Sequence, residues 1–359
     1  MRLSFQATLT GVVFAAGVGT LATEIAASRL LAPYFGNSTI VWANVIGLTL
    51  ASLSVGYWLG GRLADRYPTP RALGLIVAAA ACLVAVATLL ARPILDFSVE
   101  GLDRVSAGAA IGSFFGVLIL FVPPVTLMGM VAPFAIRLAI QDVESAGTVS
   151  GRLYAVSTVG SLLGTFLAAL VAIPAIGTQR TLLAAAALIG ASGAVLLGRR
   201  WTLLAAGLAA LLLIPPGAVK GQSGVIFEDE SRYQFIQVVE DEGVRRLYLD
   251  EGLATHSVWR EDDVLTGGVW DTYVAVVDLL GRQPERVAML GNAAGTAARA
   301  YERFYPEAEV DGVELDPAVS DAGRRYFGMG EIETLSVHDA DARAFLRRTD
   351  QTYDVIIVD

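Results

Sequence analysis

Hydrophobic residues are distributed very differently over the two parts of this 359-residue chain. Up to Val219 they form long, nearly continuous runs, whereas from Lys220 onward they recur in short alternating segments. A helix that crosses a bilayer needs roughly 20 mostly apolar residues. Windows that meet or approach this length are 8–31, 39–60, 72–91, 105–128, 149–172, 179–198 and, more weakly, 201–216. The pattern predicts a multi-pass α-helical membrane bundle over 1–219, with the lipid bilayer as a partner.

The number of crossings stays open between six and seven. The last window has only about 16 residues and ends at Pro215-Pro216-Gly217. A segment of that length falls short of the roughly 20 residues that a straight crossing needs. It could therefore cross, tilt or only re-enter the bilayer.

The second part has the pattern of an α/β protein. Segments 233–239 and 246–249 alternate as strands do, which predicts a small antiparallel β subdomain with a linker helix over 220–280. Strands and helices then alternate over 281–359, which predicts a Rossmann-like nucleoside-binding domain. The expected order is strand 287–290, helix 295–304, strand 310–314, helix 318–326, strand 334–337, helix 342–348 and strand 355–358.

The chain stops at Asp359, directly after the fourth of these parallel strands. Four such strands leave a row of unpaired backbone groups at the edge of the sheet. We expect that edge to be covered. Either the domain is incomplete at its C-terminus, or a second copy of this chain or another chain completes it.

Charge divides the chain at the same place as hydrophobicity. Residues 1–219 carry 12 arginines and seven acids, whereas residues 220–359 carry 14 basic and 28 acidic residues. A domain this acidic argues against nucleic acid as a partner, because nucleic-acid binding depends on Lys and Arg neutralising phosphates. A small cationic amine suits it better. Cys82 is the single cysteine, so no disulfide framework or Cys-based zinc site is expected, and no other metal site is predicted.

Candidate binding residues follow the predicted parallel strands. Gly291-Asn-Ala-Ala-Gly295 links a strand to a helix, where small residues let backbone amides approach a ligand, although a bare turn would look the same. Glu314 ends the next strand about 20 residues later, a position suited to ribose hydroxyls as well as to a solvated acid. Asp341 and Asp359 follow the third and fourth strands. The carboxyl ends of such strands are where open α/β sheets bind ligands.

These residues stand in motifs that together resemble the spermidine synthases, or polyamine aminopropyltransferases. Other motifs resemble the membrane-fused branch of that family, including the run Leu265-Thr-Gly-Gly-Val-Trp-Asp271 and, in the bundle, the run that begins at Gly56-Tyr-Trp-Leu-Gly-Gly. The motifs shared with the soluble enzymes are Glu230-Ser-Arg-Tyr-Gln234, Leu247-Tyr-Leu-Asp250, Val313-Glu-Leu-Asp316-Pro, Asp341-Ala-Arg-Ala-Phe and Tyr353-Asp-Val-Ile-Ile-Val-Asp359.

The resemblance implies transfer of an aminopropyl group from decarboxylated S-adenosylmethionine to an amine such as putrescine. By position, Gln234 would contact the nucleoside donor, Glu314 its ribose and Asp341 its adenine, with Gly291 and Gly295 shaping the donor loop. Asp359 would act on the attacking amine. The donor is a co-substrate, and no prosthetic group is implied.

Three departures from the family pattern bear on activity. Ala294 stands where the soluble enzymes carry an Asp that binds the donor's amino group. The second Asp of the family's D-x-x-D motif would lie beyond Asp359, and a substrate-side Gln is replaced near Thr255 or His256. These departures predict a degenerate protein with little or no aminopropyltransferase activity in the chain that ends at Asp359.

Two further classes of function stay open. The same kind of sheet binds S-adenosylmethionine itself, which would make the protein a membrane-bound methyltransferase. Alternatively, the protein is a polyamine transporter or sensor without catalysis. Glu24 bears on this alternative, because it is the only acid within a predicted crossing. An acid there needs a partner or a water-filled cavity. With Arg29 as the nearest candidate, the pair is either structural or part of an amine or proton path.

The bundle also offers a topology. Gly60-Gly-Arg-Leu-Ala-Asp65-Arg66 resembles the loop between helices two and three of major facilitator transporters, which is cytoplasmic in that family. The resemblance implies a cytoplasmic N-terminus, and eight of the 12 arginines then lie inside, as the positive-inside rule favours. Seven crossings would place the acidic domain outside the cytoplasm, where an adenosylmethionine-type donor is not expected, and six would keep it inside. We expect a multi-pass cell-membrane protein, with the side of the α/β domain left open.

Overall fold

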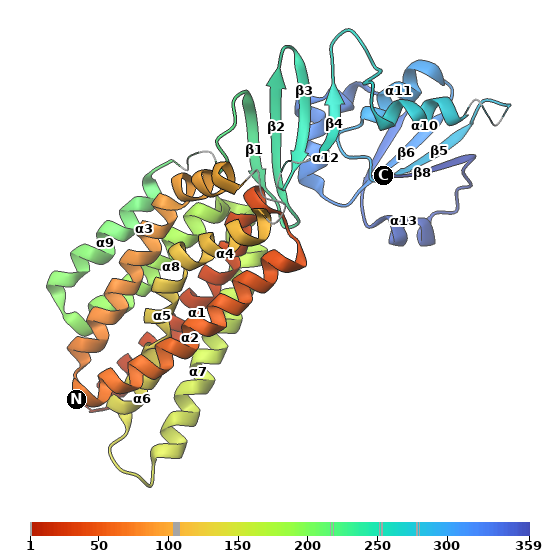
Figure 1. Cartoon of the computed structure of the whole chain (residues 1–359). Helices are drawn as coiled ribbons and strands as arrows, with labels where there is room; N and C mark the ends of the chain where they lie inside the picture. Colours follow the sequence, from red (N-terminus) through yellow and green to blue (C-terminus); the bar gives the residue numbers. More distant parts are fainter. Residues whose placement is uncertain are drawn as a thin grey trace. The chain divides into compact units, whose positions relative to one another are not determined.

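A computed structural model of the chain describes residues 2–102, 108–215, 217, 219–250, 252, 254–277, 279 and 281–359. The chain divides into two compact units, Met1–Gly221 and Gln222–Asp359. The first is helical and the second is α/β (Figure 1). This confirms the predicted order of a helical N-terminal part followed by an α/β part.

The helical unit consists of long helices joined by short turns. Its main elements are α1 (Arg2–Phe35), α2 (Thr39–Arg66), α3 (Pro70–Leu102), α4 (Gly108–Leu120), α5 (Val122–Gly129), α6 (Val131–Ala139), α7 (Ala146–Leu167), α8 (Ile173–Leu197) and α9 (Thr202–Ala210). Within the described residues, five helical segments are long and apolar enough to cross a membrane, judged by length and composition alone.

That number differs from the six or seven predicted windows for two reasons. Segment 146–197 is one continuous helical stretch that covers two predicted windows, with a π turn at Ala168–Ala172 and non-helical φ/ψ angles at Gly177. The predicted window 105–128 instead falls on α4 and α5, and α4 by itself is only 13 residues long. Residues 103–107 lie outside the described part of the chain.

Close helix crossings depend on glycines at the points of contact. A Cβ atom at Gly164 of α7 would lie 2.2 Å from the Val18 carbonyl oxygen of α1. A Cβ atom at Gly17 of α1 would in turn lie 2.4 Å from the Ser157 carbonyl oxygen of α7. Small residues let backbones approach in this way, and packing then replaces the hydrophobic effect as the source of helix association in lipid.

The last segment of the helical unit runs from one end of the bundle to the other. Leu197, at the end of α8, lies beside Gly74, near the start of α3. Gly221 lies instead beside Arg92, late in α3, and the Val219 carbonyl oxygen accepts a 2.6 Å hydrogen bond from the Tyr34 hydroxyl near the end of α1. The helical part of this segment is short, comprising α9 and the 3₁₀ turn Leu211–Leu213. The chain between Leu197 and Val219 therefore extends from one end of the bundle to the other, although α9 has only nine residues.

The α/β unit begins with a four-stranded antiparallel sheet in the order β1-β2-β3-β4. Its strands are β1 (Val225–Glu230), β2 (Phe235–Asp241), β3 (Val244–Leu249) and β4 (Thr255–Trp259). Strands β2 and β3 lie within one or two residues of the predicted segments. The alternation of the sequence did not predict β1 or β4.

A four-stranded parallel sheet follows, in the order β7-β6-β5-β8. Its elements are α10 (Val269–Val277), β5 (Arg286–Leu290), α11 (Thr296–Phe304), β6 (Glu309–Glu314), α12 (Pro317–Tyr326), β7 (Leu335–Asp339), α13 (Ala342–Arg348) and β8 (Val355–Val358). Helices α10 and α11 pack on one face of the sheet and α13 on the other. Helix α12 joins the two sheets, because its Val319 and Ala322 pack with Ile236 and Val238 of β2. The carboxyl ends of β5, β6, β7 and β8 lie side by side at one edge of this core (Figure 1).

Candidate functional site

The loop after β5 is shaped by residues with positive φ angles. Gly291 has φ +96° and Gly295 has φ +83°, and Ala293 between them has φ +45°. A Cβ atom at Gly291 would lie 2.7 Å from the backbone oxygen of Asp359. The position thus requires glycine both for its conformation and for the close passage of β8. The fold places Gly291, Gly295 and Asp359 around one loop.

Glu314 holds that loop from the end of β6. Its Oε2 atom accepts a hydrogen bond from the Ala293 amide at 3.0 Å, and its Oε1 atom accepts one from the Asp316 amide at 3.0 Å. Burial raises the pKa of the Glu314 carboxyl, and the backbone hydrogen bonds oppose that shift. A carboxylate has about four acceptor positions. Glu314 can therefore hold the loop and still accept hydrogen bonds from the hydroxyl groups of a ligand.

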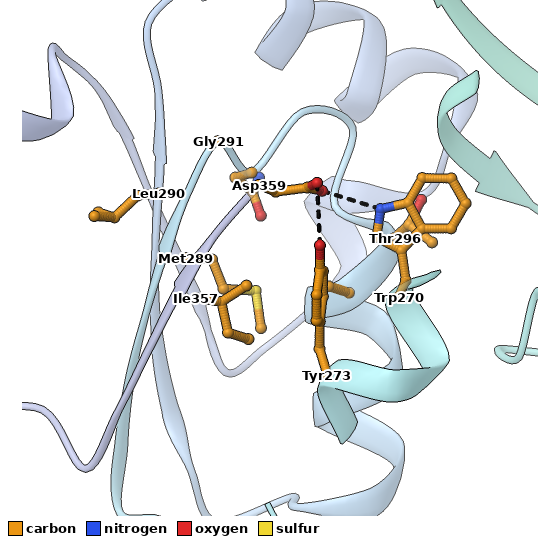
Figure 2. A pocket seen from close by; sticks show the side chains of 10 residues that line it. Trp270, Tyr273, Met289, Leu290, Gly291, Thr296, Ile357 and Asp359 are labelled. Carbon is orange, nitrogen blue, oxygen red and sulfur yellow. Dashed lines mark hydrogen bonds between the residues drawn. The ribbon is translucent and has the colours of Figure 1, made fainter. Parts of the chain in front are cut away.

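Asp359 lies where β8 ends, beside a small pocket (Figure 2). Its Oδ2 atom accepts a hydrogen bond from the Trp270 indole at 3.1 Å, and its Oδ1 atom accepts one from the Tyr273 hydroxyl at 3.2 Å. Both donors project from α10 toward the carboxylate (Figure 2). Burial, together with the charge of Asp359, raises the pKa of Tyr273, so this hydroxyl keeps its proton and donates. The two donors orient the acid next to Gly291 and Thr296, which also line the pocket.

Asp341 has a local role in this structure. It begins α13 as its N-cap, and its Oδ1 atom accepts a hydrogen bond from the Arg343 amide at 2.8 Å. Its Oδ2 atom pairs with the Arg343 guanidinium at 2.8 Å. These bonds lower the pKa of the exposed Asp341 carboxyl to about 2. The preceding residue, Ala340, donates its amide to the Glu314 carbonyl oxygen at 2.8 Å, which places Asp341 at the same edge of the sheet.

Gln234 contacts Asp316, a buried acid that follows β6 of the parallel sheet. Its side-chain amide lies 3.4 Å from the Oδ2 atom of Asp316, which also accepts a 2.5 Å hydrogen bond from the Ser231 hydroxyl. Asp316 is only 2% exposed, and its Oδ1 atom caps α12 at the Ala318 amide. This contact fixes the β subdomain against the end of β6. Among the described residues, Gln234 makes no hydrogen bond to Glu314 or Asp359.

The antiparallel sheet also supports the loop itself. Ser257 of β4 accepts a hydrogen bond from the Ala294 amide at 2.9 Å, and the Thr296 hydroxyl exchanges hydrogen bonds with both backbone groups of Val258. Ala294 has no exposed surface and packs with Ile236 and Val238 of β2. The methyl group at this position therefore fills a packed interior and presents no polar atom to a ligand.

The structure does not bring Glu24 and Arg29 together. Among the described residues, Glu24 makes no hydrogen bond or ion pair. The physical reason is helical geometry, because five residues along a helix turn the second side chain about 140° away from the first. Arg29 has an interaction of its own elsewhere.

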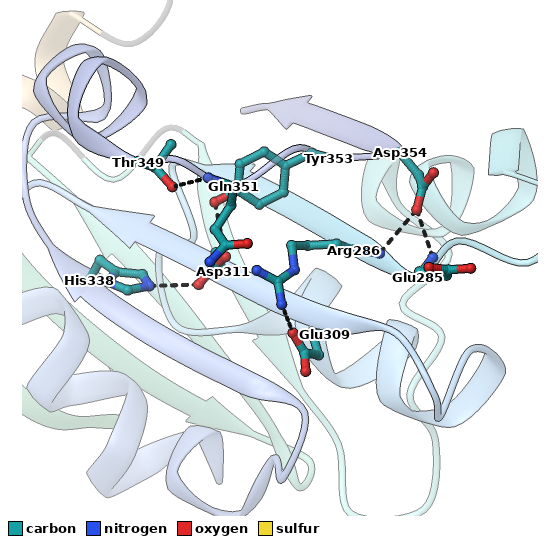
Figure 3. Close-up of polar contacts among 9 residues, drawn as sticks. All are labelled: Glu285, Arg286, Glu309, Asp311, His338, Thr349, Gln351, Tyr353 and Asp354. Atoms are coloured by element: carbon teal, nitrogen blue, oxygen red, sulfur yellow. Dashed lines mark hydrogen bonds and ion pairs between the residues drawn. The ribbon is translucent and has the colours of Figure 1, made fainter.

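A second polar cluster on the α/β unit extends from the starts of β5 and β8 to His338, the residue before the end of β7 (Figure 3). Asp354 accepts hydrogen bonds from the amides of Glu285 at 2.8 Å and Arg286 at 3.1 Å, and these bonds lower the pKa of its carboxyl. Asp311 accepts a 2.9 Å bond from the Tyr353 hydroxyl and lies 2.7 Å from the Nε2 atom of His338. These contacts tie neighbouring strands of the sheet together.

Residue spacing did not identify four of the residues that build the site. Trp270 and Tyr273 are 89 and 86 positions from the acid that they hold, and Ser257 and Asp316 act through contacts between the two sheets. A weak signal for the first pair did exist. Two aromatic residues three apart on one helix share a face, next to the run Leu265–Asp271 that resembles the membrane-fused branch.

Comparisons with known proteins agree with this geometry in the C-terminal part. Residues 271–359 match the family model of the spermine/spermidine synthase domain. A polyamine aminopropyltransferase of Vibrio vulnificus is 34% identical over 154 residues, which cover 41% of this chain and 51% of that protein. A probable polyamine aminopropyl transferase of Bifidobacterium longum is 32% identical over 138 residues, which cover 38% of this chain and 30% of that protein.

Among solved structures, a probable spermidine synthase from Corynebacterium glutamicum aligns with a TM-score of 0.33 and 21% identity. The alignment covers 39% of this chain and 52% of that one. The chain spans about half the length of the Vibrio relative and less of the Bifidobacterium relative. The C-terminal part of the chain thus matches the spermine/spermidine synthase domain and is similar to polyamine aminopropyltransferases.

Proposed function

We propose that this protein is a membrane-bound, spermidine synthase-like transferase that moves an aminopropyl group from decarboxylated S-adenosylmethionine to an amine such as putrescine. The observation that carries this proposal is the placement of Asp359. Its carboxylate is oriented by Trp270 and Tyr273 and stands beside the Gly291 loop that Glu314 holds. A proton acceptor and a nucleoside-binding loop thus share one edge of the sheet.

The donor fits the residues of the loop in part. The ionised carboxylate of Glu314 would accept hydrogen bonds from the two ribose hydroxyls. The glycines would let the donor approach the loop backbone closely. Asp341 would meet the adenine from the next strand end, once its contact with Arg343 rearranges or is shared. Gln234 would approach the donor from the β subdomain, to which Asp316 fixes it.

The reaction requires a neutral amine. An ammonium ion has no lone pair, so Asp359 would hold the acceptor and take its proton as the nitrogen attacks the carbon next to the sulfonium. The new bond joins nitrogen to carbon, and the carbon–sulfur bond breaks with its electron pair on sulfur. Methylthioadenosine leaves, and the positive charge of the sulfonium is replaced by that of the proton released. Trp270 and Tyr273 keep the carboxylate in one orientation through this step.

A second candidate function is recognition of the nucleoside or amine without turnover. Ala294 favours it, because a fully buried methyl group stands where the resemblance implies a carboxylate for the donor's amino group. A site that binds ribose and adenine but leaves the aminopropyl group unheld would bind the donor without aligning it. Positional errors of about 1 Å can lower rates on the order of a hundredfold.

We also propose that the helical unit crosses the membrane six or seven times. Five apolar helical segments of sufficient length support the bilayer location, and one of them, Ala146–Leu197, has 52 residues and is long enough to cross twice. That makes six crossings, and the passage from Leu197 to Val219 would be the seventh. Seven crossings would place Gln222–Asp359 on the side opposite the N-terminus and its arginine-rich end, and six would place it on the same side, where the donor of the proposed transfer is expected. Protease treatment of sealed vesicles of known orientation tests this side, because only an exposed α/β unit is cut.

The test of catalysis uses the purified protein with decarboxylated S-adenosylmethionine and putrescine, followed by chromatography for methylthioadenosine. Replacing a general base typically costs 10²- to 10⁴-fold in rate, so Asp359→Asn is expected to lower product formation by about a hundredfold or more. Asp350→Asn, a change at an exposed acid of the same unit, is the matched control. Equal rates in both variants would remove Asp359 from the chemistry. Donor binding by calorimetry without product in the parent protein would favour the second candidate.

A further inference from the structure

A polar cavity lies inside the helical unit, distant in sequence from every residue of the proposed transferase site. It has a volume of about 70 Å³ and lies among α1, α2, the α5–α6 junction and α7. Its polar lining consists of Thr20, Tyr57, Ser157 and Ser161. The remaining walls are apolar side chains and glycines, including Gly17 and Gly129. The space holds more than one water-sized group and is too small for a nucleoside.

Two of these hydroxyl groups already donate hydrogen bonds to backbone carbonyl oxygens. The Thr20 hydroxyl donates to the Ala16 carbonyl oxygen at 2.7 Å, and the Ser161 hydroxyl donates to the Gly17 carbonyl oxygen at 3.4 Å. A hydroxyl has one proton and two acceptor positions. The oxygens of Thr20 and Ser161 therefore remain as acceptors only. A ligand that satisfies them has to donate hydrogen bonds.

By helical spacing, the carboxyl group of Glu24 lies on the same face of α1, one turn beyond the residues that line the cavity. The cavity-lining residues of this helix include Val13, Gly17, Thr20 and Leu21, which recur at the three- and four-residue spacing of one helix face. Glu24 continues that series three and four positions further on. It is half-buried and makes no hydrogen bond or ion pair with any described residue. An acid in such surroundings is costly unless a cation or water meets it.

We propose that this cavity binds the primary ammonium group of a small aliphatic amine. The Thr20 and Ser161 oxygens accept two of its N–H bonds, and Glu24, one turn along α1, supplies the countercharge. The carboxylate disfavours anions, and a neutral alcohol has no charge to pair with it. The site belongs to the helical unit and stands on its own, whether or not the α/β unit transfers aminopropyl groups.

The experiment places a chemical reporter in the cavity of the full-length protein in detergent. Ser157→Cys puts a thiol in the lining, in a Cys82→Ala background that removes the native one. The rate of modification by neutral methyl methanethiosulfonate is measured with increasing 1,4-diaminobutane, and with 1,4-butanediol as the uncharged equivalent. Because the reporter lies in the cavity, amine bound at the α/β unit leaves its rate unchanged. Leu21→Cys serves as a second reporter should the first variant not fold.

The diamine is expected to slow modification in a saturable way, and the diol is not. Glu24→Gln removes the countercharge at nearly constant volume, and it is expected to weaken protection about tenfold or more. Glu144→Gln makes the same change at an exposed acid of the same unit and is expected to leave protection intact. Protection that survives Glu24→Gln, equal protection by the diol, or none by the diamine with either reporter would each overturn the proposal.

Discussion

The two units of this protein use glycine for opposite physical purposes. In the helical unit, Gly164 keeps ordinary helical angles and is needed because a Cβ atom would meet the Val18 carbonyl oxygen at 2.2 Å. In the α/β unit, Gly291 is needed for its φ of +96° as well as for space beside Asp359. Glycine in the first unit brings two helices together, and glycine in the second bends the loop of the proposed ligand site.

Polar groups show the same contrast. The α/β unit gathers carboxylates at the ends of its parallel strands, where backbone amides and aromatic donors hold them. The helical unit mostly uses hydroxyl groups that donate to backbone carbonyl oxygens of the same helix, as Thr20 does, and it contains few charged side chains. A polar site in water can be built from charges, whereas one in an apolar bundle is built from groups that need little solvation.

The largest expected effect is a difference in how the two units partition between membrane and aqueous fractions. The full-length protein is expected to stay in the membrane fraction after carbonate or high-salt washing and to enter solution only with detergent, because its helical unit exposes apolar side chains such as Trp42, Leu50 and Phe166. A shortened chain that begins near Lys220 is expected in the soluble fraction. Immunoblots of the fractions measure both. Release of the full-length chain by carbonate would mean that the two units do not differ in this way.

Next in size is a test of helix contact. Gly164→Val forces a side chain against the α1 backbone, and overpacking of this kind typically costs 1 to 3 kcal/mol. The thermal midpoint of the detergent-solubilised protein is expected to fall by several degrees. Gly151→Val on the same helix meets no atom within 4 Å and is the matched control. Similar losses in both variants would attribute the effect to helix propensity instead of contact.

The third test sharpens the role of the buried acid in the α/β unit. Glu314→Gln is expected to weaken donor binding by roughly 1 to 3 kcal/mol, because a charged hydrogen bond to ribose is lost. Calorimetry with decarboxylated S-adenosylmethionine and with S-adenosylmethionine measures this change for both donors. Unchanged affinity would leave Glu314 with the loop as its only partner.

Stability should respond to pH in a direction that the raised pKa of Glu314 fixes. The folded protein holds this proton more tightly than the unfolded chain, so the contribution is full below the unfolded pKa and is lost as pH rises through the folded one. The stability of the parent relative to Glu314→Gln is therefore expected to decrease from acid toward neutral pH. Denaturant titrations of both proteins at several pH values follow it.

The smallest effect is expected at Asp341. Because this acid is exposed and already paired with Arg343, Asp341→Asn is expected to weaken donor binding only a few-fold. Its lowered pKa of about 2 means that its contribution to stability is present above the ordinary Asp range and is lost only as pH falls toward 2. Calorimetry measures the first point and acid titration of unfolding the second. A loss larger than that of Glu314→Gln would reverse the order proposed for the two acids.

Local pattern predicted most of the parallel sheet, because β5 and β8 are short apolar runs and strand and helix segments alternate along this part of the chain. It missed β4, whose Thr255–Trp259 sequence has no clear alternation and becomes a strand through pairing with β3. It missed β1 for a similar reason, since Val225–Glu230 ends in acids. Propensity is weak where neighbouring strands decide the structure.

The site divides in the same way. Gly291, Glu314 and Asp359 were predictable, because a rule about strand ends places them without knowledge of side-chain packing. Trp270 and Tyr273 were not, since their contact with Asp359 depends on how α10 lies against β8. In the bundle, the spacing of Glu24 and Arg29 suggested a pair that the turn of the helix separates.

Glu314 joins three strand ends at a single residue. Its two carboxylate oxygens hold the amides of Ala293 and Asp316, and its carbonyl oxygen accepts the amide of Ala340. Amide hydrogens held in this way exchange with solvent only when the bonds open. The exchange rates of these three amides therefore report how often the loops around the site separate. A ligand that binds Glu314 and holds these loops together is expected to slow exchange at all three amides.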